Sequence, residues 1–542
     1  MPPPQERLKK NLGLFDVYAI STGAMFSSGF FLLPGLAAAK AGPAVVLAYF
    51  FAGLLILPSM FSKAELSTAL PKAGGTYYFL DRSLGPMFGT IGGLGTYLAL
   101  TLKTAFALIG IGAYASLFVE LPIKPVAVAL TVAFVGINIV GAKESSGLQR
   151  VLVIILMTVL AFFLAQGFHE LLVDQPAAES LAQFDPFMPF GVAGLLSTIG
   201  FVFVSYAGLT KVASVAEEVQ NPERNIPLGM MLSLVSTTFV YVAGVAVMVA
   251  VLDPVEFRGD LTPVATAAQI FFDWLPGQIG LLLIVIAALA AFASTGNAGV
   301  MSASRYPLAM ARDNLVPGVL GKLGRFQTPT PAIVATGALM IVFILVLNEE
   351  GIAKLASAFQ LFIFGLVNLA VIVMRESRIP SYDPGYKSPF YPWMQVAGML
   401  VSIVLIAYMG WLAIMFTVGV IVICLVWYYR YARERVERDG AIYHWFSRLG
   451  QTPNEGLDRE FREIMKEKGL RSDDPFDEVM ARAQFVEALE GEDFDLIVER
   501  AAHLLSERLD VPAERLIVGF AKGTRVGATP VSHGAALPHL HI

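Results

Sequence analysis

The sequence predicts an all-α polytopic membrane protein, and three observations indicate that class. Of 542 residues, 56% are hydrophobic and only 15% are charged, whereas soluble domains average about 25% charged residues. Residues 431–542 hold 36 of the 81 charged side chains, and residues 1–430 hold the other 45. The first part also contains twelve long apolar segments. We therefore expect a transmembrane domain over residues 1–430 and a small α or α/β cytoplasmic region over residues 431–542.

Each apolar segment has about the length that a membrane-spanning helix needs. Roughly 20 mostly apolar residues cross the hydrocarbon core of a bilayer. Proline and glycine residues separate the segments, at the positions where helices are expected to end. The twelve predicted transmembrane helices lie near residues 15–38, 44–66, 86–117, 124–141, 148–168, 191–216, 229–252, 278–303, 332–348, 352–374, 391–409 and 411–430.

The lysine and arginine residues predict the orientation. Loops on the amino-terminal side of the membrane carry sixteen of them, with Lys63, Arg305 and Arg312 in that group. Loops on the opposite side carry only four, Lys40, Lys124, Arg258 and Lys354. Basic loops stay on the cytoplasmic side of a membrane. We expect a multi-pass protein of the plasma or inner membrane with both termini in the cytoplasm.

Two of the segments are interrupted by small polar residues. The first contains the run from Ser21 to Phe31 and the sixth the run from Phe201 to Thr210, and both place glycine and serine in mid-membrane. A helix break there frees backbone groups, which is tolerated only beside a cavity or a ligand. Interrupted helices at matching positions in two halves of a chain are typical of a transporter binding site. Close helix packing through small residues is the alternative explanation.

Four motifs resemble the amino acid–polyamine–organocation (APC) superfamily, over about residues 10–430. They are the first span from Gly23 to Pro34, the loop residues Glu65–Leu66 with Pro71–Tyr78, the run from Glu217 to Pro227, and the run from Arg305 to Pro317. The resemblance implies an amino acid permease fold. It contains a 5+5 inverted repeat with broken helices 1 and 6, two extra helices, and alternating access.

The resemblance also implies the positions of the site residues. The substrate carboxylate is expected at the backbone of Ser27, Ser28 and Gly29, and the amine near the carbonyl groups of Gly23, Met25 and Phe203. Opposite them we expect Ser205, Tyr206 and Gly208. Three loop residues, Glu65, Glu218 and Arg224, are expected to brace the inner gate. Loop capping and a role in topology are the alternative for these three.

The eighth segment contains a candidate sodium site. Ala291, Ser294 and Thr295 place one carbonyl and two hydroxyl groups at adjacent positions on a helix. The resemblance implies that first-span carbonyl groups, near Gly23 and Phe26, complete the ligand set. Alternatively, both hydroxyl groups bond to carbonyl groups four residues earlier, as helical hydroxyl groups often do. The fifth span lacks the lysine of proton-coupled relatives, which favours sodium as the coupling ion.

Lys103 lies deep in the third segment, with apolar residues on both sides. A lysine at that depth is costly unless it faces a cavity or a partner. It is a candidate coupling residue: a proton carrier, a surrogate for a cation, or a ligand for an anionic group. The alternative is snorkelling to the membrane surface, which we also expect for Lys211 near a helix end.

The charged C-terminal region has helical patterns over residues 457–468, 475–489 and 493–509. From Phe494 onwards it weakly resembles the start of a phosphotransferase-system IIA domain of the fructose–nitrogen type. That resemblance makes His539 a candidate phosphorylation site, and it predicts either that the natural chain continues past Ile542 or that the tail folds differently. His533, His539 and His541 are an alternative metal-binding group. We expect a regulatory domain, with a cytoplasmic partner or self-association through it.

These observations predict a secondary-active amino acid transporter, a symporter driven by sodium. The spans contain no paired carboxylates and no nucleophile with a histidine partner, and no phosphate-binding loop is present, so we expect no enzyme activity. Sodium is the one cofactor expected, and the small net charge of −5 predicts no nucleic-acid partner. Two alternatives remain: a potassium or chloride carrier of the same fold, and a solute sensor that signals through its tail.

Overall fold

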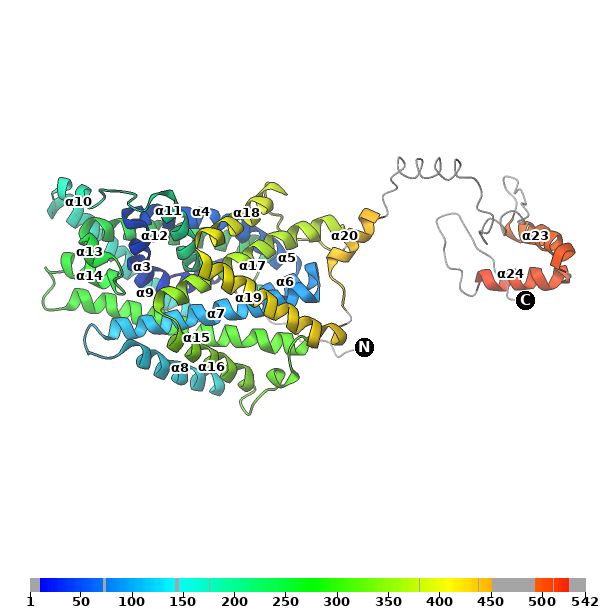
Figure 1. Ribbon diagram of the computed structural model, residues 1–542, viewed down its shortest axis with the longest axis horizontal. Helices are drawn as coiled ribbons and strands as arrows, with labels where there is room; N and C mark the ends of the chain where they lie inside the picture. Colours follow the sequence, from blue (N-terminus) through cyan, green and yellow to red (C-terminus); the bar gives the residue numbers. More distant parts are fainter. Residues whose placement is uncertain are drawn as a thin grey trace. The chain divides into compact units, whose positions relative to one another are not determined.

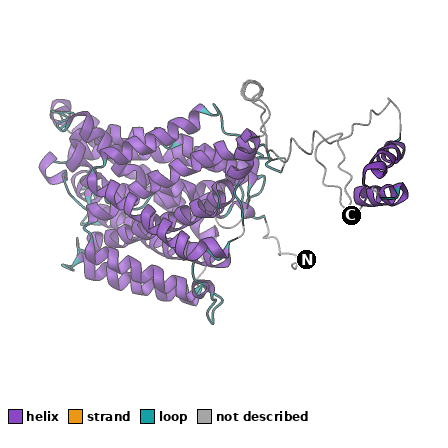
Figure 2. Cartoon of the chain, turned by 45° about the vertical axis from the view of Figure 1, so that its right-hand side comes forward, coloured by secondary structure: helices purple, strands orange, loops and turns teal. Residues whose placement is uncertain are grey.

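A computed structural model describes residues 10–71, 75–141, 146–174, 176–379, 381–436, 438–450, 493–509 and 511–525. Within these ranges the regular elements are helices, and no strand occurs (Figure 2). The chain divides into two compact units, Met1–Gln451 and Thr452–Ile542, which are described separately. The helical composition confirms the predicted fold class.

The first unit has the helices of a polytopic membrane protein (Figure 1). In the described ranges, nine helices are long and apolar enough to cross a membrane, and two shorter apolar helices, Thr330–Val346 and Trp393–Tyr408, accompany them. The nine are Leu33–Ala69, Pro86–Ala115, Ile123–Val140, Arg150–Val173, Gly191–Ser214, Pro222–Val251, Ile279–Arg312, Glu349–Ser377 and Trp411–Arg435.

The helix bounds follow the predicted segments closely, but the first two segments are divided into shorter helices. The first segment forms α1 (Leu14–Met25), α2 (Ser28–Phe31) and α3 (Leu33–Ala41), and the second forms α4 (Val45–Leu55) and α5 (Leu57–Ala69). The other segments form α7 (Pro86–Ala115), α8 (Ile123–Val140), α9 (Ser146–His169), α11 (Gly191–Val202) with the 3₁₀ helix η3 (Phe203–Ser214), α12 (Pro222–Val251), α15 (Ile279–Arg312), α16 (Thr330–Val346), α17 (Glu349–Ser377), α18 (Trp393–Tyr408) and α19 (Trp411–Trp427).

Shorter helices that the apolar pattern did not predict connect these elements. They include α6 (Gly75–Leu84), α10 (Ala177–Ala182), α13 (Pro254–Phe257), α14 (Pro263–Phe271) and α20 (Ala441–Gly450). Each is too short to appear as a membrane-spanning segment. Helix α14 is nevertheless largely buried and packs against α15, so an apolar segment too short to span the membrane contributes to the core.

Helix α7 is the centre of the packing, since it lies along both α15 and α17 (Figure 1). Its glycines allow this close approach. A Cβ at Gly110 would lie 2.5 Å from the Phe292 ring, and one at Gly95 would lie 3.0 Å from Ile363. Inside a membrane the hydrophobic effect does not drive helices together, so small residues at the interfaces are needed for close packing. The close packing of α7 sets the positions of the residues that it carries toward the site.

A buried ionic network joins α5 to the end of α17. Glu65 is fully buried and accepts two hydrogen bonds from the Arg375 guanidinium, at 2.7 and 2.6 Å. The Tyr382 hydroxyl donates to the same carboxylate at 2.9 Å, and Ser388 donates to it through both its backbone N–H and its hydroxyl, at 2.8 and 2.6 Å. The carboxylate therefore accepts five hydrogen bonds, and it connects α5 to the end of α17 and the loop that follows it, 310 to 323 residues away in sequence.

The compact unit continues beyond the last apolar helix. Arg438 donates to an Asp313 carboxylate oxygen at 2.6 Å, and Arg448 donates to Glu376 at 3.2 Å, so this segment contacts the ends of α15 and α17. Helix α20 packs against α17 and α6. Residues 431–450 thus belong to the same compact unit as the apolar helices, and the division into transmembrane and cytoplasmic parts remains a prediction.

The second unit contains two described helices, α23 (Phe494–Leu509) and α24 (Ala513–Arg525), which pack against each other. Helix α23 confirms the predicted helix over residues 493–509. The predicted helices over 457–468 and 475–489 lie outside the described residues, as do His533, His539 and His541.

Replacing Glu65 with glutamine is expected to destabilise the protein by about 3–5 kcal/mol, because the Arg375 charge is left without its counter-charge. The effect is measured as a loss of thermal stability in detergent. Glu350→Gln is the matched control, since Glu350 pairs with Lys40 where the two side chains are 42% and 24% exposed. Such a pair contributes about 0–1 kcal/mol. Equal stability of the two variants would contradict a structural role for the network.

Candidate functional site

The first membrane helix is broken where glycine and serine were found in the sequence. Helix α1 ends at Met25, and Phe26 and Ser27 have non-helical backbone angles before α2 begins at Ser28. The sixth helix also changes form at mid-length, because α11 ends at Val202 and the chain continues as 3₁₀ helix η3. The predicted break in helix 1 is thus present, whereas helix 6 stays helical and changes from α to 3₁₀ at the predicted position.

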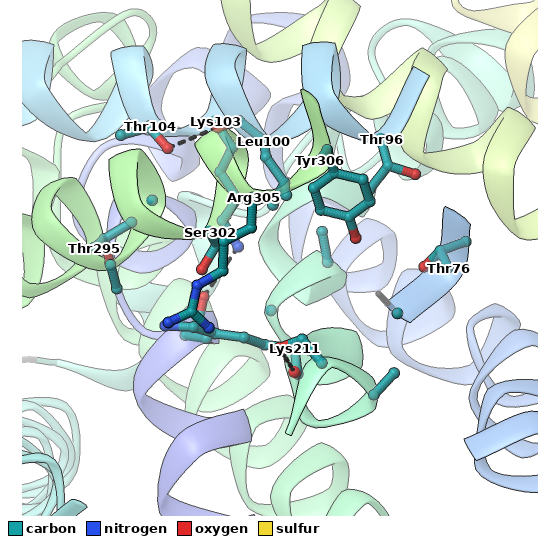
Figure 3. A pocket seen from close by; sticks show the side chains of 18 of the residues that line it. Thr76, Thr96, Leu100, Lys103, Thr104, Lys211, Thr295, Ser302, Arg305 and Tyr306 are labelled. Carbon is teal, nitrogen blue, oxygen red and sulfur yellow. Dashed lines mark hydrogen bonds between the residues drawn. The ribbon is translucent and has the colours of Figure 1, made fainter. Parts of the chain in front are cut away.

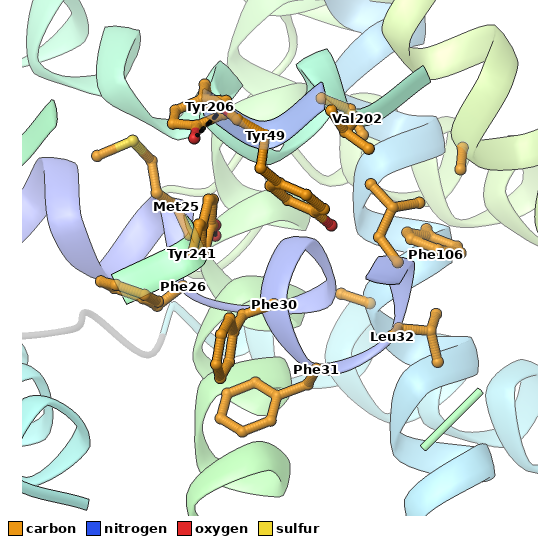
Figure 4. Packing of buried hydrophobic residues seen from close by; sticks show 14 of the residues in the cluster. Met25, Phe26, Phe30, Phe31, Leu32, Tyr49, Phe106, Val202, Tyr206 and Tyr241 are labelled. Carbon is orange, nitrogen blue, oxygen red and sulfur yellow. Dashed lines mark hydrogen bonds between the residues drawn. The ribbon is translucent and has the colours of Figure 1, made fainter. Parts of the chain in front are cut away.

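Tyrosine hydroxyl groups satisfy several carbonyl groups at the first break. Tyr241 donates to the Met25 carbonyl and Tyr49 to the Gly29 carbonyl, both at 2.8 Å. Tyr114 donates to the next turn, at the Phe31 carbonyl, at 2.7 Å. All three side chains are fully buried, and Figure 4 shows Tyr49 and Tyr241 beside the break. The Met25 carbonyl, a predicted ligand of the substrate amine, already accepts one hydrogen bond in this conformation.

Helix α2 packs directly against η3. A Cβ at Gly29 would lie 2.7 Å from the Ser205 Cβ, so the two backbones are in contact at this glycine. Phe30 and Phe31 are fully buried and pack edge-on against each other, with ring centroids 5.6 Å apart (Figure 4). The structure is therefore closed on the α2 side of the break. Seven predicted substrate-binding residues lie on this closed side, outside the cavity lining: Met25, Ser27, Ser28, Gly29, Phe203, Ser205 and Tyr206.

On the other side of the break lies a cavity of about 320 Å³ (Figure 3). The end of α1, the start of α6, and parts of α5, α7, η3, α15 and α17 form its walls. At one end are the exposed residues Arg305 and Arg312, and Gly23 is half-buried at the break itself. Five predicted site residues line the cavity: Gly23, Lys103, Gly208, Ser294 and Thr295.

Lys103 has a partner that the sequence did not reveal. Its Nζ donates a hydrogen bond to the Ala24 carbonyl at 3.0 Å. Ala24 lies in the last turn of α1, where carbonyl groups lack helical partners and attract positive charge. Lys103 is only 8% exposed. It therefore does not snorkel to a membrane surface but lies in the cavity wall, bound to the broken end of helix 1.

The candidate sodium site is divided between the cavity and the packed core. Ser294 and Thr295 line the cavity, whereas Ala291 and Phe26 are buried outside its lining. The Thr295 hydroxyl is buried and has no hydrogen-bond partner. Many other helical threonines donate their hydroxyl to the backbone carbonyl four residues earlier. These threonines are Thr90, Thr96, Thr101, Thr104, Thr131, Thr158, Thr198 and Thr336. Thr295 departs from that habit, as do Thr237, Thr238 and Thr417, and of these four only Thr295 lines the cavity.

One lysine is placed differently from the sequence prediction. Lys63 is predicted as a loop residue, but it lies within α5, is 2% exposed and lines the cavity. Lys211 lies in the last turn of η3, near a helix end as predicted, and it also lines the cavity. The sequence alone does not reveal these positions, because the other walls of the cavity come from helices distant in sequence.

The loop after the sixth span contacts the beginning of the described chain. Leu12 and Val219 form an isolated bridge, in which the Leu12 N–H donates to the Glu218 carbonyl at 3.0 Å. The Gln220 N–H donates to the Leu12 carbonyl at 2.9 Å. The backbone at Glu218 thus attaches the start of helix 1 to the end of helix 6. A bracing role for Glu65, Glu218 and Arg224 at an inner gate stays a prediction.

A bundle of apolar helices, with a broken helix 1 and a partly 3₁₀ helix 6 beside a cavity, is typical of a membrane transporter. The family model described as amino acid permease matches residues 16–434, and the chain belongs to this family. The match confirms the resemblance to the APC superfamily. It identifies a multi-pass membrane transporter of amino acids rather than an enzyme. The match ends at residue 434, and the resemblance of the C-terminal region to a IIA domain stays a prediction.

Three relatives show how widely substrates vary in this group. The branched-chain amino acid permease BcaP of Bacillus subtilis (strain 168) is 29% identical over 453 residues, which cover 79% of this chain and 94% of the relative. The methylthioribose transporter of the same organism is 26% identical, covering 71% and 85%. The vacuolar cationic amino acid transporter 2 of Arabidopsis thaliana is 28% identical, covering 69% and 62%. These names differ in substrate charge, so the specificity of this chain must be inferred from its own cavity.

The close contact between η3 and the end of α1 predicts an effect of Gly208→Ala. A Cβ at Gly208 would overlap the backbone of Ala24, so the two helices must separate. We expect Gly208→Ala to lower amino acid uptake into proteoliposomes at least tenfold. Gly136→Ala in α8 is the matched control, because a Cβ there meets nothing within 4 Å. Equal uptake by both variants would show that the contact at Gly208 is unimportant for transport.

Proposed function

We propose that this protein is a secondary-active amino acid transporter that works by alternating access. Family membership supports the substrate class, and the cavity beside the break in helix 1 is the observation that carries the mechanism. A transporter of this kind must reach its central site from one side at a time. Here the α2 side of the break is packed and the α1 side is accessible, which is the asymmetry that alternating access requires.

The accessible side is proposed to face the cytoplasm. Arg305 and Arg312 at the outer end of the cavity belong to the basic side of the membrane. Basic loops stay in the cytoplasm, so the conformation is inward-facing. The Glu65 network and the Leu12–Val219 bridge lie on elements of the same side, where an inner gate would close.

The substrate is proposed to bind between the end of α1 and η3. Gly23 and Gly208 already line the cavity there. The expected carboxylate-binding backbone of Ser27, Ser28 and Gly29 begins immediately beyond Phe26. Access to it requires α2 to separate from η3 at the contact between Gly29 and Ser205. Tyr241, which bonds to the Met25 carbonyl and lies 3.4 Å from the Ser205 carbonyl, is placed to control that separation.

Sodium coupling is supported by the donor chemistry around Thr295. Its hydroxyl is buried without a partner, and neutral oxygens of this kind suit a monovalent cation. Ser294 and the carbonyl groups of Gly23, Phe26 and Ala291 complete the proposed set. A bound cation would supply charge at the broken end of helix 1. Lys103 already supplies a positive charge there through its bond to Ala24, so we propose it as the second coupling element.

An inorganic-anion carrier of the same fold is the second candidate. The cavity lining supports this alternative, because it contains several cationic side chains and no aspartate or glutamate from the described residues. Purified protein in proteoliposomes separates the two functions. We expect uptake of a labelled amino acid that rises with an imposed ion gradient. Chloride flux without amino acid uptake would overturn the proposal and favour the anion carrier.

Removing the two hydroxyl groups tests the sodium site. Ser294→Ala combined with Thr295→Ala is expected to abolish the stimulation of uptake by a sodium gradient, because the hydroxyl ligands are lost. Thermal stability without sodium is expected to stay equal or rise, since the Thr295 hydroxyl makes no hydrogen bond. Thr336→Ala is the control, because this buried hydroxyl bonds to the Ala332 carbonyl in α16. Unchanged sodium stimulation in the double variant would refute the site.

A further inference from the structure

The walls of the cavity carry an excess of positive charge. Among the described residues that line it, none is aspartate or glutamate, whereas five are basic: Lys63, Lys103, Lys211, Arg305 and Arg312. They come from four elements, α5, α7, η3 and α15. Figure 3 shows the side chains of Lys103, Lys211 and Arg305 directed toward the same space. The positive charge is thus a property of the whole cavity rather than of one helix.

Two of these lysines are buried, and no carboxylate pairs with either in the described part of the chain. Lys63 is 2% exposed, and its Nζ lies 4.8 Å from the centroid of the Phe364 ring. Lys103 is 8% exposed and donates to the neutral Ala24 carbonyl. An ammonium group in such surroundings costs several kcal/mol unless a counter-charge approaches it. The face of the Phe364 ring and the Ala24 carbonyl offset only part of this cost.

The acidic residues around the cavity do not supply the counter-charge. Glu65, two residues after Lys63, is bound by Arg375. Asp81 pairs with Arg82, and Asp313 accepts from Arg438.

The topology of the membrane does not explain the buried lysines either. Positive charge on the cytoplasmic side occurs in exposed positions near the ends of helices. Arg305 and Arg312 are exposed and fit that rule, whereas Lys63 and Lys103 are buried and do not. No described residue supplies their counter-charge, and an anionic molecule that enters the cavity would supply it.

We propose that the transported substrate is a dicarboxylic amino acid, whose side-chain carboxylate binds near Lys63 and Lys103. This inference rests on the proposed function of amino acid transport. A dicarboxylic amino acid brings one net negative charge, and it fits a cavity of about 320 Å³. A neutral amino acid leaves the two lysines uncompensated. A cationic amino acid adds a like charge to five others.

Selectivity of the unmodified protein is the first test. Full-length protein in proteoliposomes is given labelled L-glutamate, and L-aspartate, L-glutamine, L-lysine, L-leucine and chloride are added as competitors. Glutamine matches glutamate in size and lacks only the charge. We expect glutamate to bind at least tenfold more tightly than glutamine, with aspartate the best competitor. Thermal stabilisation of the detergent-purified protein by the same compounds gives an independent measure of binding.

Substitution of a buried lysine is the second test. Lys63→Met is expected to weaken glutamate binding by about tenfold to a hundredfold, because one charge-assisted interaction is lost. It should leave glutamine binding nearly unchanged. Lys354→Met is the matched control, because this half-buried lysine of α17 does not line the cavity. If Lys63→Met does not fold, the selectivity of the unmodified protein still decides the question.

The outcomes separate this inference from the proposed function. Uptake of leucine or lysine in preference to glutamate would overturn the inference and leave amino acid transport intact. Stabilisation and flux with chloride alone would assign the positive cavity to an inorganic anion and overturn the inference. Absence of uptake for every amino acid would refute both the inference and the proposed function.

Discussion

The structure depends on one constraint, which is that a helix broken inside the membrane must satisfy its freed backbone groups within the protein. Helix 1 meets this constraint with side chains from three other elements, α4, α7 and α12. Tyr49, Tyr114 and Tyr241 donate to carbonyl groups at and beyond the break, and Lys103 donates to Ala24 just before it. The break is therefore a defined junction, and it divides the unit into a packed side and an accessible side.

This division explains how one site can serve two sides of a membrane. The packed side is closed by contact between α2 and η3 and by aromatic rings that are fully buried. Proteins switch between discrete packed arrangements rather than deforming continuously. The tyrosines bond to backbone carbonyl groups of helix 1 or helix 6, and we propose that these bonds hold one of the two arrangements of the alternating-access cycle. The Glu65 network joins α5 to the end of α17.

Most of the fold could be predicted from the sequence, because hydrophobic length and positive charge are local properties. The twelve segments, the break after Met25 and the helix over residues 493–509 all depend on residues close together in the chain. The side chains that bond to the backbone around the break in helix 1 could not be predicted in this way. Tyr241 lies 216 residues from Met25, and Lys103 lies 79 residues from Ala24, so only the packing of the helices reveals these bonds. The burial of Lys63 also depends on distant residues, because its Nζ lies over the ring of Phe364 in α17.

The central claim is that the cavity beside the break is the substrate site and opens to the cytoplasm. Site-directed labelling tests it directly, because Cys424, the one native cysteine, is buried. Ser302→Cys places a thiol in the cavity lining, and Ser402→Cys places one in a buried position of α18 as the control. The account predicts that a membrane-impermeant thiol reagent labels Ser302→Cys only in inside-out vesicles, and that transported amino acid protects it. Labelling from the outside alone, or labelling that no amino acid prevents, would contradict the account.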